Sequence, residues 1–451
     1  MSATDSPPAT SIPKLSREQI EAYWLPYTGN RQFKDDPRIV VQADGCYYTD
    51  DKGRKVFDGL SGLWTCGAGH NRAEINEAVS KQLKQLDFAP SFQYGHPLAF
   101  ELANKIVEVM PEGLDHVFFT NSGSESTDTA TKIARGYWRQ RGRPEKTRII
   151  GRIKGYHGAS WGAISFGGVG ANRKLWGQGM ESDHLPHTML KENTFTRGMP
   201  GHGAYLADDL EELVALHDAS NIAAVIVEPL AGSAGVIPPP EGYLPRLRKI
   251  CDKHNILLIF DEVITAFGRM GAWTGSDAFG AVPDIIGTAK QLTNGIIPMG
   301  AVIVKGEIYG AFMDAGGPDY AIELPHGYTY SGHPVACAAA LATLDILHKD
   351  KLIERVAEMA PVFEEALHSL RGSNRYILDI RNYGLAGALT IEHVPGEPAL
   401  RPFQIAMKCW EKGFYVRYGG DTIQLGLPFI VSREEIDAVI NVLGESIDEL
   451  T

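Results

Sequence analysis

Short apolar runs separated by amphipathic stretches fill the middle of the chain. The runs are rich in Val, Ile and Leu and lie at 117–120, 148–153, 223–228, 256–261, 284–288 and 301–304. Unbroken apolar runs of this length are typical of strands buried on both faces of a parallel sheet, and the helical periodicity between them predicts covering helices. We therefore expect an α/β protein built on a mainly parallel sheet.

The N-terminal part of the chain follows another pattern. A helix signal from Ser16 gives way to turn-rich sequence by about Gln32. Two short apolar stretches, 39–41 and 46–49, then flank Asp44-Gly45, which predicts a hairpin. Two amphipathic helices are expected between 72 and 109.

The C-terminal part predicts a second, smaller lobe. Beyond a turn at 330–334, a long helix is expected over 335–348, and strand signals at 377–381 and 387–391 lie between further helices up to residue 450. We divide the chain into three parts: an N-terminal segment, 1–71, that contributes to the small domain; a large domain, 72–333; and a small α+β domain, 334–451.

Composition narrows the classes of function. The 451 residues are 44% hydrophobic and carry a net charge of −12, so no broad basic field is available for nucleic acid or an anionic membrane, and neither is expected as a partner. No run approaches 18 apolar residues, and Met1–Pro13 has no signal-peptide pattern, so a cytoplasmic location is expected. The five scattered cysteines form no CxxC pair and predict reduced thiols without a metal site.

Two of the apolar runs end in charged residues, Asp261 and Lys290. Open α/β sheets place ligands at the carboxyl ends of their strands, so both residues should face one crevice. A lysine can hold an aldehyde cofactor as a Schiff base, and a carboxylate can keep a pyridine nitrogen protonated. The pair therefore indicates pyridoxal 5'-phosphate (PLP) chemistry, although either residue alone would suit an ordinary strand end at the solvent.

A phosphate-binding turn is expected at 121–126, where an apolar strand runs through Ser122, Gly123 and Ser124 into a helix. Free N–H groups and the positive end of the helix dipole bind an anion there, and Gly123 allows close approach. The alternative is an ordinary serine N-cap.

Three further strand ends offer groups for a cofactor ring. Tyr156 and His157 lie on a glycine-flanked loop after a strand, and Tyr156 could stack on a heterocycle or merely pack the loop. Val263 shares the strand parity of Asp261 and could cover the other ring face. Glu228 ends another run and could bond ring substituents or be a solvated strand end.

Together these segments resemble class III PLP-dependent aminotransferases. Six motifs occur in the family order, at 121–125, 155–158, 227–229, 261–263, 289–295 and 329–334. The resemblance implies fold type I, with a mainly parallel sheet of the seven-stranded type and a smaller α+β domain. It also implies that Lys290 carries the cofactor, that Asp261 contacts the ring nitrogen, and that Thr329 reaches the phosphate of the neighbouring subunit.

The segment 416–424, with Leu63-Trp64 and Gly69-His70, resembles the branch that transfers amino groups from ω-amino acids such as β-alanine to pyruvate. In that branch Arg417 would bind the substrate carboxylate, and Trp64 and Phe92 would line the substrate pocket. The alternative for Arg417 is a surface arginine. The resemblance also implies amine and 2-oxo acid substrates and a homodimer with shared active sites, or a tetramer.

Other functions stay open at this stage. Within PLP enzymes the alternatives are an ω-aminotransferase that uses 2-oxoglutarate and an aminomutase, and a catalytically silent scaffold is conceivable. A dehydrogenase is suggested by Gly67-Ala68-Gly69 and by 167–170, but neither segment completes GxGxxG between a strand and a helix.

Overall fold

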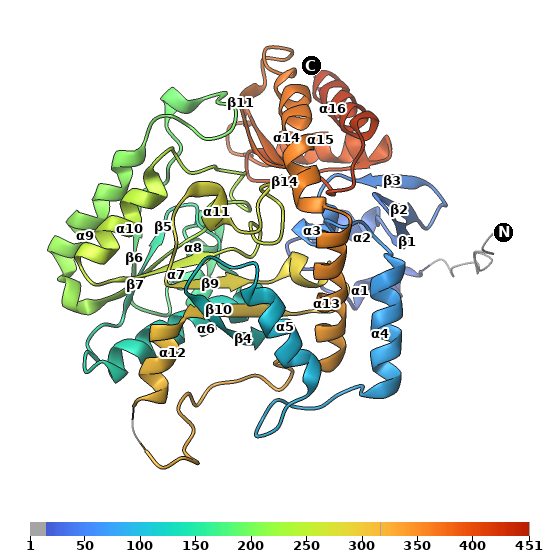
Figure 1. Cartoon of the computed structure of the whole chain (residues 1–451). Helices are drawn as coiled ribbons and strands as arrows, with labels where there is room; N and C mark the ends of the chain where they lie inside the picture. Colours follow the sequence, from blue (N-terminus) through green and yellow to red (C-terminus); the bar gives the residue numbers. More distant parts are fainter. Residues whose placement is uncertain (1–14, 316, 451) are drawn as a thin grey trace.

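A computed structural model of the protein describes residues 15–315 and 317–450. The expectations for Met1–Pro13 lie outside these residues. The described chain forms a large α/β lobe and a smaller lobe in which the N-terminal segment meets the C-terminal region (Figure 1). The division at 71 and 333 stays a prediction.

A central sheet of seven strands, in the order β4-β10-β9-β8-β7-β5-β6, forms the large lobe. Its strands are β4 Leu114–Thr120, β5 Arg148–Arg152, β6 Ser182–Leu185, β7 Ile222–Val227, β8 Leu257–Asp261, β9 Ile285–Thr288 and β10 Gly300–Lys305. Only β10 runs antiparallel to its neighbours, β4 and β9. The mainly parallel sheet is thus confirmed, and β6 is a strand that the apolar pattern missed because this edge strand is half polar.

The central strands are buried on both faces, as their composition predicts. In β8, Leu257 and Ile259 enter a cluster with residues of α6 (Gly123–Gln140), whereas Leu258 and Phe260 pack in the cluster that contains α10 (Tyr243–Lys253). This two-sided cover leaves the strand ends as the exposed edge of the layer.

Two four-stranded sheets form the rest of the structure. The first has the order β1-β2-β3-β13 and combines β1 Val40–Asp44, β2 Tyr47–Asp50 and β3 Lys55–Asp58 with β13 Phe414–Tyr415. The second has the order β11-β12-β15-β14 and contains β11 Ile377–Tyr383, β12 Ala386–Ile391, β14 Arg417–Gly419 and β15 Thr422–Gly426. The predicted hairpin is confirmed, and the parallel pairing of β13 with β3 ties the two ends of the chain together.

Helices pack around these sheets. Besides α6 and α10 they are α1 Arg17–Glu21, α2 Asn30–Asp35, α3 Ser61–Trp64, α4 Ala73–Gln85, α5 Pro97–Val107, α7 Trp161–Phe166, α8 Gly170–Trp176, α9 Asp209–His217, α11 Gly275–Phe279, α12 Gly306–Met313, α13 Pro334–Lys349, α14 Leu352–His368, α15 Leu400–Glu411 and α16 Arg433–Asp448, and four short 3-10 turns are η1 Lys191–Asn193, η2 Ala204–Asp208, η3 Ala219–Asn221 and η4 Lys290–Thr293. The predicted long helix is α13, which packs against both α4 and α5 (Figure 1).

Two expectations from composition can be compared with the fold. Cysteines 46, 66, 251, 337 and 409 are all free thiols, as predicted. Across the described ranges, no helix is both long and apolar enough to cross a membrane. The glycines at 167–170 join α7 to α8, and Gly67 and Gly69 lie between α3 and α4. Neither segment lies between a strand and a helix, which removes the motif basis for a dehydrogenase.

Candidate active site

A pocket opens where the carboxyl ends of β5, β7, β8 and β9 meet the N-terminus of α6. Its walls come from Gly123, Ser124, Tyr156, His157, Gly158, Glu228, Ser233, Asp261, Val263, Ile264 and Lys290. The parallel strands bring together residues up to 167 positions apart, between 123 and 290, at the edge where such sheets bind ligands. Asp261 and Lys290 therefore face one crevice, as the strand ends predict.

Asp261 is held in place by two hydrogen bonds. Its carboxylate is 7% exposed. His157 Nδ1 donates to Oδ2 over 2.8 Å, and the Val263 N–H donates to Oδ1 over 3.2 Å. Both hydrogen bonds fix the orientation of the carboxylate, which lines the pocket where a ring nitrogen could be bound.

Lys290 follows β9 in a left-handed conformation, with φ 47°. Its amine makes no hydrogen bond or ion pair with any residue in the described ranges. Burial lowers its pKa to about 8; Asp261 and Glu228 oppose this shift, and the charge of Arg417 adds to it. A neutral amine is therefore accessible near neutral pH, as a nucleophile or proton carrier requires.

Glu228 lies directly after β7 and is 4% exposed. Its carboxylate accepts hydrogen bonds from the N–H groups of Tyr156, at 2.8 Å, and Gly232, at 3.1 Å. Burial raises its pKa to about 7, with the charge of His157 opposing and that of Asp261 adding to the shift. Glu228 is thus a buried carboxyl that fixes the Tyr156 loop, and the solvated strand end is excluded.

Tyr156 and Val263 both line the pocket. Burial raises the pKa of the Tyr156 phenol, and the Tyr27 ring meets the Tyr156 ring edge-on at 6.5 Å between centroids. Val263 lies beyond the last residue of β8, so the strand-parity reason given for it was wrong although its position is in the pocket. The turn after Asp261 brings it there.

The N-terminus of α6, where a phosphate-binding turn is predicted, forms one end of the pocket. Ser122 is the N-cap, and its hydroxyl accepts from the Glu125 N–H at 3.2 Å, so the alternative interpretation holds for Ser122. The N–H groups of Gly123 and Ser124 have no intrahelical acceptor. The Ser124 hydroxyl accepts from the Ala159 N–H at 3.0 Å and keeps its own proton for an anion.

The residues present fit PLP. Lys290 and the first N–H groups of α6 supply the amine and the anion donors that the cofactor requires, and Asp261 supplies the carboxylate. His157 Nε2 is buried and has no partner, which leaves a polar atom beside the pocket for a ligand or water. Gly123 leaves space in the cradle, since a Cβ there would lie 2.9 Å from Val263 Cγ2.

Of the three residues predicted to contact the substrate, only Arg417 lines a cavity beside the pocket. Arg417, in β14, lines a second cavity beside the pocket and lies close enough to affect the pKa of Lys290. Its guanidinium makes no hydrogen bond or ion pair with a described residue. This unpaired guanidinium can donate hydrogen bonds to a substrate carboxylate.

Trp64 does not line the pocket. It is 2% exposed, and the guanidinium carbon of Arg269 lies 5.6 Å from its ring centre. Gly426 leaves the space that the indole fills, since a Cβ there would lie 2.4 Å from Trp64 Cζ3. The expectation that Trp64 lines the substrate pocket is thus corrected, because its indole is buried in the hydrophobic core.

Phe92 and Thr329 lie on the surface of the single chain. Phe92 is 53% exposed and packs against Gly327, whose Cβ position lies 2.8 Å from Phe92 Cε1. Thr329, two residues after Gly327 in the sequence, is also exposed. Neither side chain lines the pocket within its own subunit.

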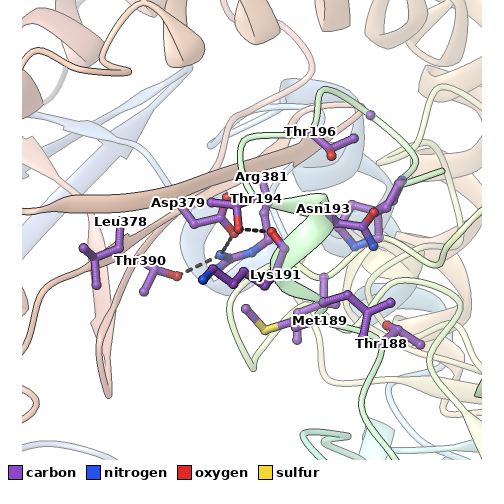
Figure 2. Close-up of a pocket in the computed structure, with 15 residues that line it drawn as sticks. Thr188, Met189, Lys191, Asn193, Thr194, Thr196, Leu378, Asp379, Arg381 and Thr390 are labelled. Carbon is purple, nitrogen blue, oxygen red and sulfur yellow. Dashed lines mark hydrogen bonds and ion pairs between the residues drawn. The ribbon is translucent and has the colours of Figure 1, made fainter. Parts of the chain in front are cut away.

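Another cavity, of about 220 Å³, lies between the loop at 188–200 and the β11–β12 edge (Figure 2). Its buried guanidinium, Arg381, is paired with Asp379 at 2.5 Å and donates to Thr390 at 2.8 Å and to the Gly235 carbonyl. Because Asp379 already compensates this charge, the Arg381 guanidinium is not free to bind an anionic substrate.

Sequence reasoning missed Gly158, Ser233, Ile264 and Tyr27. Gly158 stood within a recognised motif, and its φ of +123° is the signal for a required glycine. Ser233 and Ile264 lie in loops after strands, where no periodicity marks them. Tyr27 lies in the N-terminal segment, and tertiary packing brings its ring against Tyr156.

Comparisons with known proteins agree with this site. The model of a family described as aminotransferase class-III matches residues 29–447. A beta-alanine–pyruvate aminotransferase of Pseudomonas aeruginosa is 57% identical over 443 residues, 98% of this chain and 99% of that protein. An omega-amino acid–pyruvate aminotransferase of Pseudomonas putida is 57% identical over 437 residues, 96% of this chain and 97% of that protein.

Solved structures share the fold. An amine transaminase from an uncultivated Pseudomonas species, in its PLP-bound form, superimposes with a TM-score of 0.87 at 35% identity, covering 95% of this chain and 99% of that chain.

Proposed function

Because the chain belongs to the class III aminotransferases, a PLP-dependent family, we propose that it transfers an amino group to pyruvate. The donor is an ω-amino acid of the β-alanine type or a primary amine, and the products are an aldehyde or ketone and L-alanine. The unpaired guanidinium of Arg417 beside Lys290 is the observation that carries this proposal, together with the substrates for which the two relatives are named.

PLP, when bound, supplies an electrophilic carbon and a protonated ring that takes up electron density. Lys290 would hold it covalently and, once displaced by the incoming amine, carry a proton at Nζ away from the carbon that bears the amino group. Asp261 would keep the ring nitrogen protonated, with His157 orienting its carboxylate. Tyr156 and Val263 would confine the ring between them, and Gly123 and Ser124 would bind the phosphate.

Arg417 would select the substrate through its carboxylate. A planar guanidinium binds a carboxylate through two parallel hydrogen bonds, which orients the amino acid as well as attracting it. The same residue would serve β-alanine in one half-reaction and pyruvate in the other, since the two bind in alternation. Transfer in two half-reactions predicts parallel double-reciprocal plots.

The proposal includes a homodimer with shared active sites. Thr329 is exposed in the single chain, and the nearby side chains of Phe92, Tyr94 and Tyr330 are 53%, 62% and 58% exposed. Aromatic surface of this kind is typical of protein interfaces. Thr329 would reach the phosphate of the neighbouring subunit from this surface.

The test compares acceptors. Alanine formation from β-alanine is expected to be faster with pyruvate than glutamate formation is with 2-oxoglutarate, and Arg417→Gln should lower kcat/KM for β-alanine by about tenfold or more, as loss of a charge-assisted bond costs. A preference for 2-oxoglutarate, or isomerisation of the amino acid without an acceptor, would instead support the alternative members of the family.

A further inference from the structure

An aromatic cavity of about 370 Å³ lies beside the cofactor pocket. Residues of the N-terminal segment, including Tyr27, Phe33 and Arg38, form one side, and residues of α15 and β14, including Trp410 and Arg417, form the other. Its volume is within the range of small-molecule sites.

The cavity adjoins the pocket in which the reaction would take place. Tyr27 lines it and also contacts Tyr156 of the cofactor pocket at 6.5 Å between ring centres. Arg417 lines it and lowers the pKa of both Tyr156 and Lys290. The two pockets are therefore neighbours, and a substrate chain that passes Tyr27 and Arg417 from Lys290 would enter this cavity.

The walls are suited to an apolar chain. Phe33, Val40, Met407 and Trp410 contribute aromatic and aliphatic surface. Packing methylene groups against such surface is favourable because it removes apolar area from water. The cavity thus favours ligands with several methylene groups.

A second guanidinium, that of Arg38, also lines the cavity. It lies over the Phe33 ring at 5.1 Å and donates to Gln32 Oε1 at 3.1 Å and to the Asp36 carbonyl at 3.4 Å. Arg38 forms no ion pair with any residue in the described ranges. Burial lowers its pKa, with the charges of Tyr418 and Asp36 opposing.

A comparison with Arg381 shows that Arg38 lacks a carboxylate partner among the described residues. Arg381 is buried in the cavity of Figure 2 with Asp379 as its counter-charge, whereas Arg38 is half-buried and has only neutral acceptors within hydrogen-bond distance. A half-buried cation without a counter-ion gains most from an anionic ligand.

We propose that Arg38 binds the carboxylate of ω-amino acids that are too long to end at Arg417. The cavity then takes the methylene chain between the amine at Lys290 and the carboxylate at Arg38. This inference rests on the proposed function, because the amine must react at Lys290. It deepens that function by assigning short ω-amino acids to Arg417 and long ones to Arg38.

The test uses the holoenzyme with pyruvate and ω-amino acids of increasing length, starting from β-alanine. Each ω-amino acid is paired with the n-alkylamine of the same carbon number, which lacks the carboxylate. For the long members, Arg38→Gln should lower the ratio of kcat/KM, ω-amino acid over alkylamine, by about tenfold, with the loss mainly in KM. Arg38→Lys keeps the charge and should retain part of the ratio.

Arg31→Gln is the matched control, because Arg31 is exposed on α2 and lies outside the cavity. An unchanged ratio in Arg38→Gln at every length, an equal loss in Arg31→Gln, or no wild-type preference for long ω-amino acids over their alkylamines would overturn the inference. Failure of the proposed function would look different: the wild type would form no alanine from β-alanine and pyruvate.

Discussion

His157 Nδ1 lies 2.8 Å from Asp261 Oδ2, and both side chains are buried. The Val263 N–H occupies the other oxygen at 3.2 Å. Two donors on one buried carboxylate fix its direction, and the carboxylate lines the pocket. The carboxylate that would face the cofactor ring is therefore oriented before any ligand binds, which is the basis of preorganisation.

Asp261→Asn is expected to lower kcat by about 10²- to 10³-fold, because a neutral amide cannot hold the ring nitrogen protonated. Steady-state kinetics with β-alanine and pyruvate measure this loss. His157→Asn should give a smaller loss, about tenfold, since it removes orientation but not charge.

The control for Asp261→Asn is Asp183→Asn. Asp183 also pairs with a histidine, His217, at 2.9 Å, but far from the pocket in the β6 edge strand. Equal effects of the two Asp→Asn variants would show that the loss comes from disturbed packing and would contradict the role given to Asp261.

Lys290 predicts a specific pH dependence. Burial lowers its pKa from 10.5 to about 8, so the fraction of neutral amine is half at pH 8 and falls about tenfold for each unit below. The rate at which cofactor-free protein takes up PLP should rise with pH with a midpoint near 8. Arg417→Gln should move the midpoint upward, because the Arg417 charge contributes to the lowering. A midpoint near the ordinary lysine value in the native protein would contradict this environment.

Gly158→Ala is expected to weaken PLP binding and to destabilise the fold by about 1–3 kcal/mol. Gly158 has φ +123°, and a Cβ there would lie 2.4 Å from Ser124 Oγ, so the Ser124 side chain, which would bind the phosphate, must move. Denaturant unfolding and PLP titration measure the two effects. Gly170→Ala is the control, since its Cβ position has nothing within 4 Å, and its stability should change by less than about 0.5 kcal/mol.

Mixed dimers test whether Thr329 acts across the subunit boundary. Lys290→Ala and Thr329→Asp are each expected to be nearly inactive as homodimers. Their heterodimer would contain one site with both native residues if Thr329 serves the neighbouring subunit, and activity should return to about half that of the native dimer. If Thr329 acts within its own subunit, no native site forms and the mixture stays inactive.

The sequence could predict residues at the ends of buried strands. Asp261, Glu228 and Lys290 were found because an apolar run that ends in a polar residue places that residue at the ligand-binding edge of the sheet. The turn at 121–126, two of whose residues line the pocket, was predicted because a helix start leaves free N–H groups. These signals depend only on residues that are adjacent in the sequence, so they do not require knowledge of tertiary contacts.

The remaining residues depend on distant contacts. Tyr27 and Arg38 line the cavity beside the site only because the N-terminal segment packs beside α15 and β14. Trp64 is buried because Gly426, 362 positions later, leaves space for its ring. Thr329 and Phe92 lie on the surface of one chain, so their placement in a site requires a partner that no local pattern describes.

The central claim is that this site moves an amino group from an ω-amino acid to pyruvate. The most direct measurement incubates the PLP-loaded protein with ¹⁵N-labelled β-alanine and unlabelled pyruvate and follows the label by mass spectrometry. The account predicts that ¹⁵N appears in alanine in equal amount to the β-alanine consumed. Loss of β-alanine without label in alanine, or no turnover at all, would contradict it.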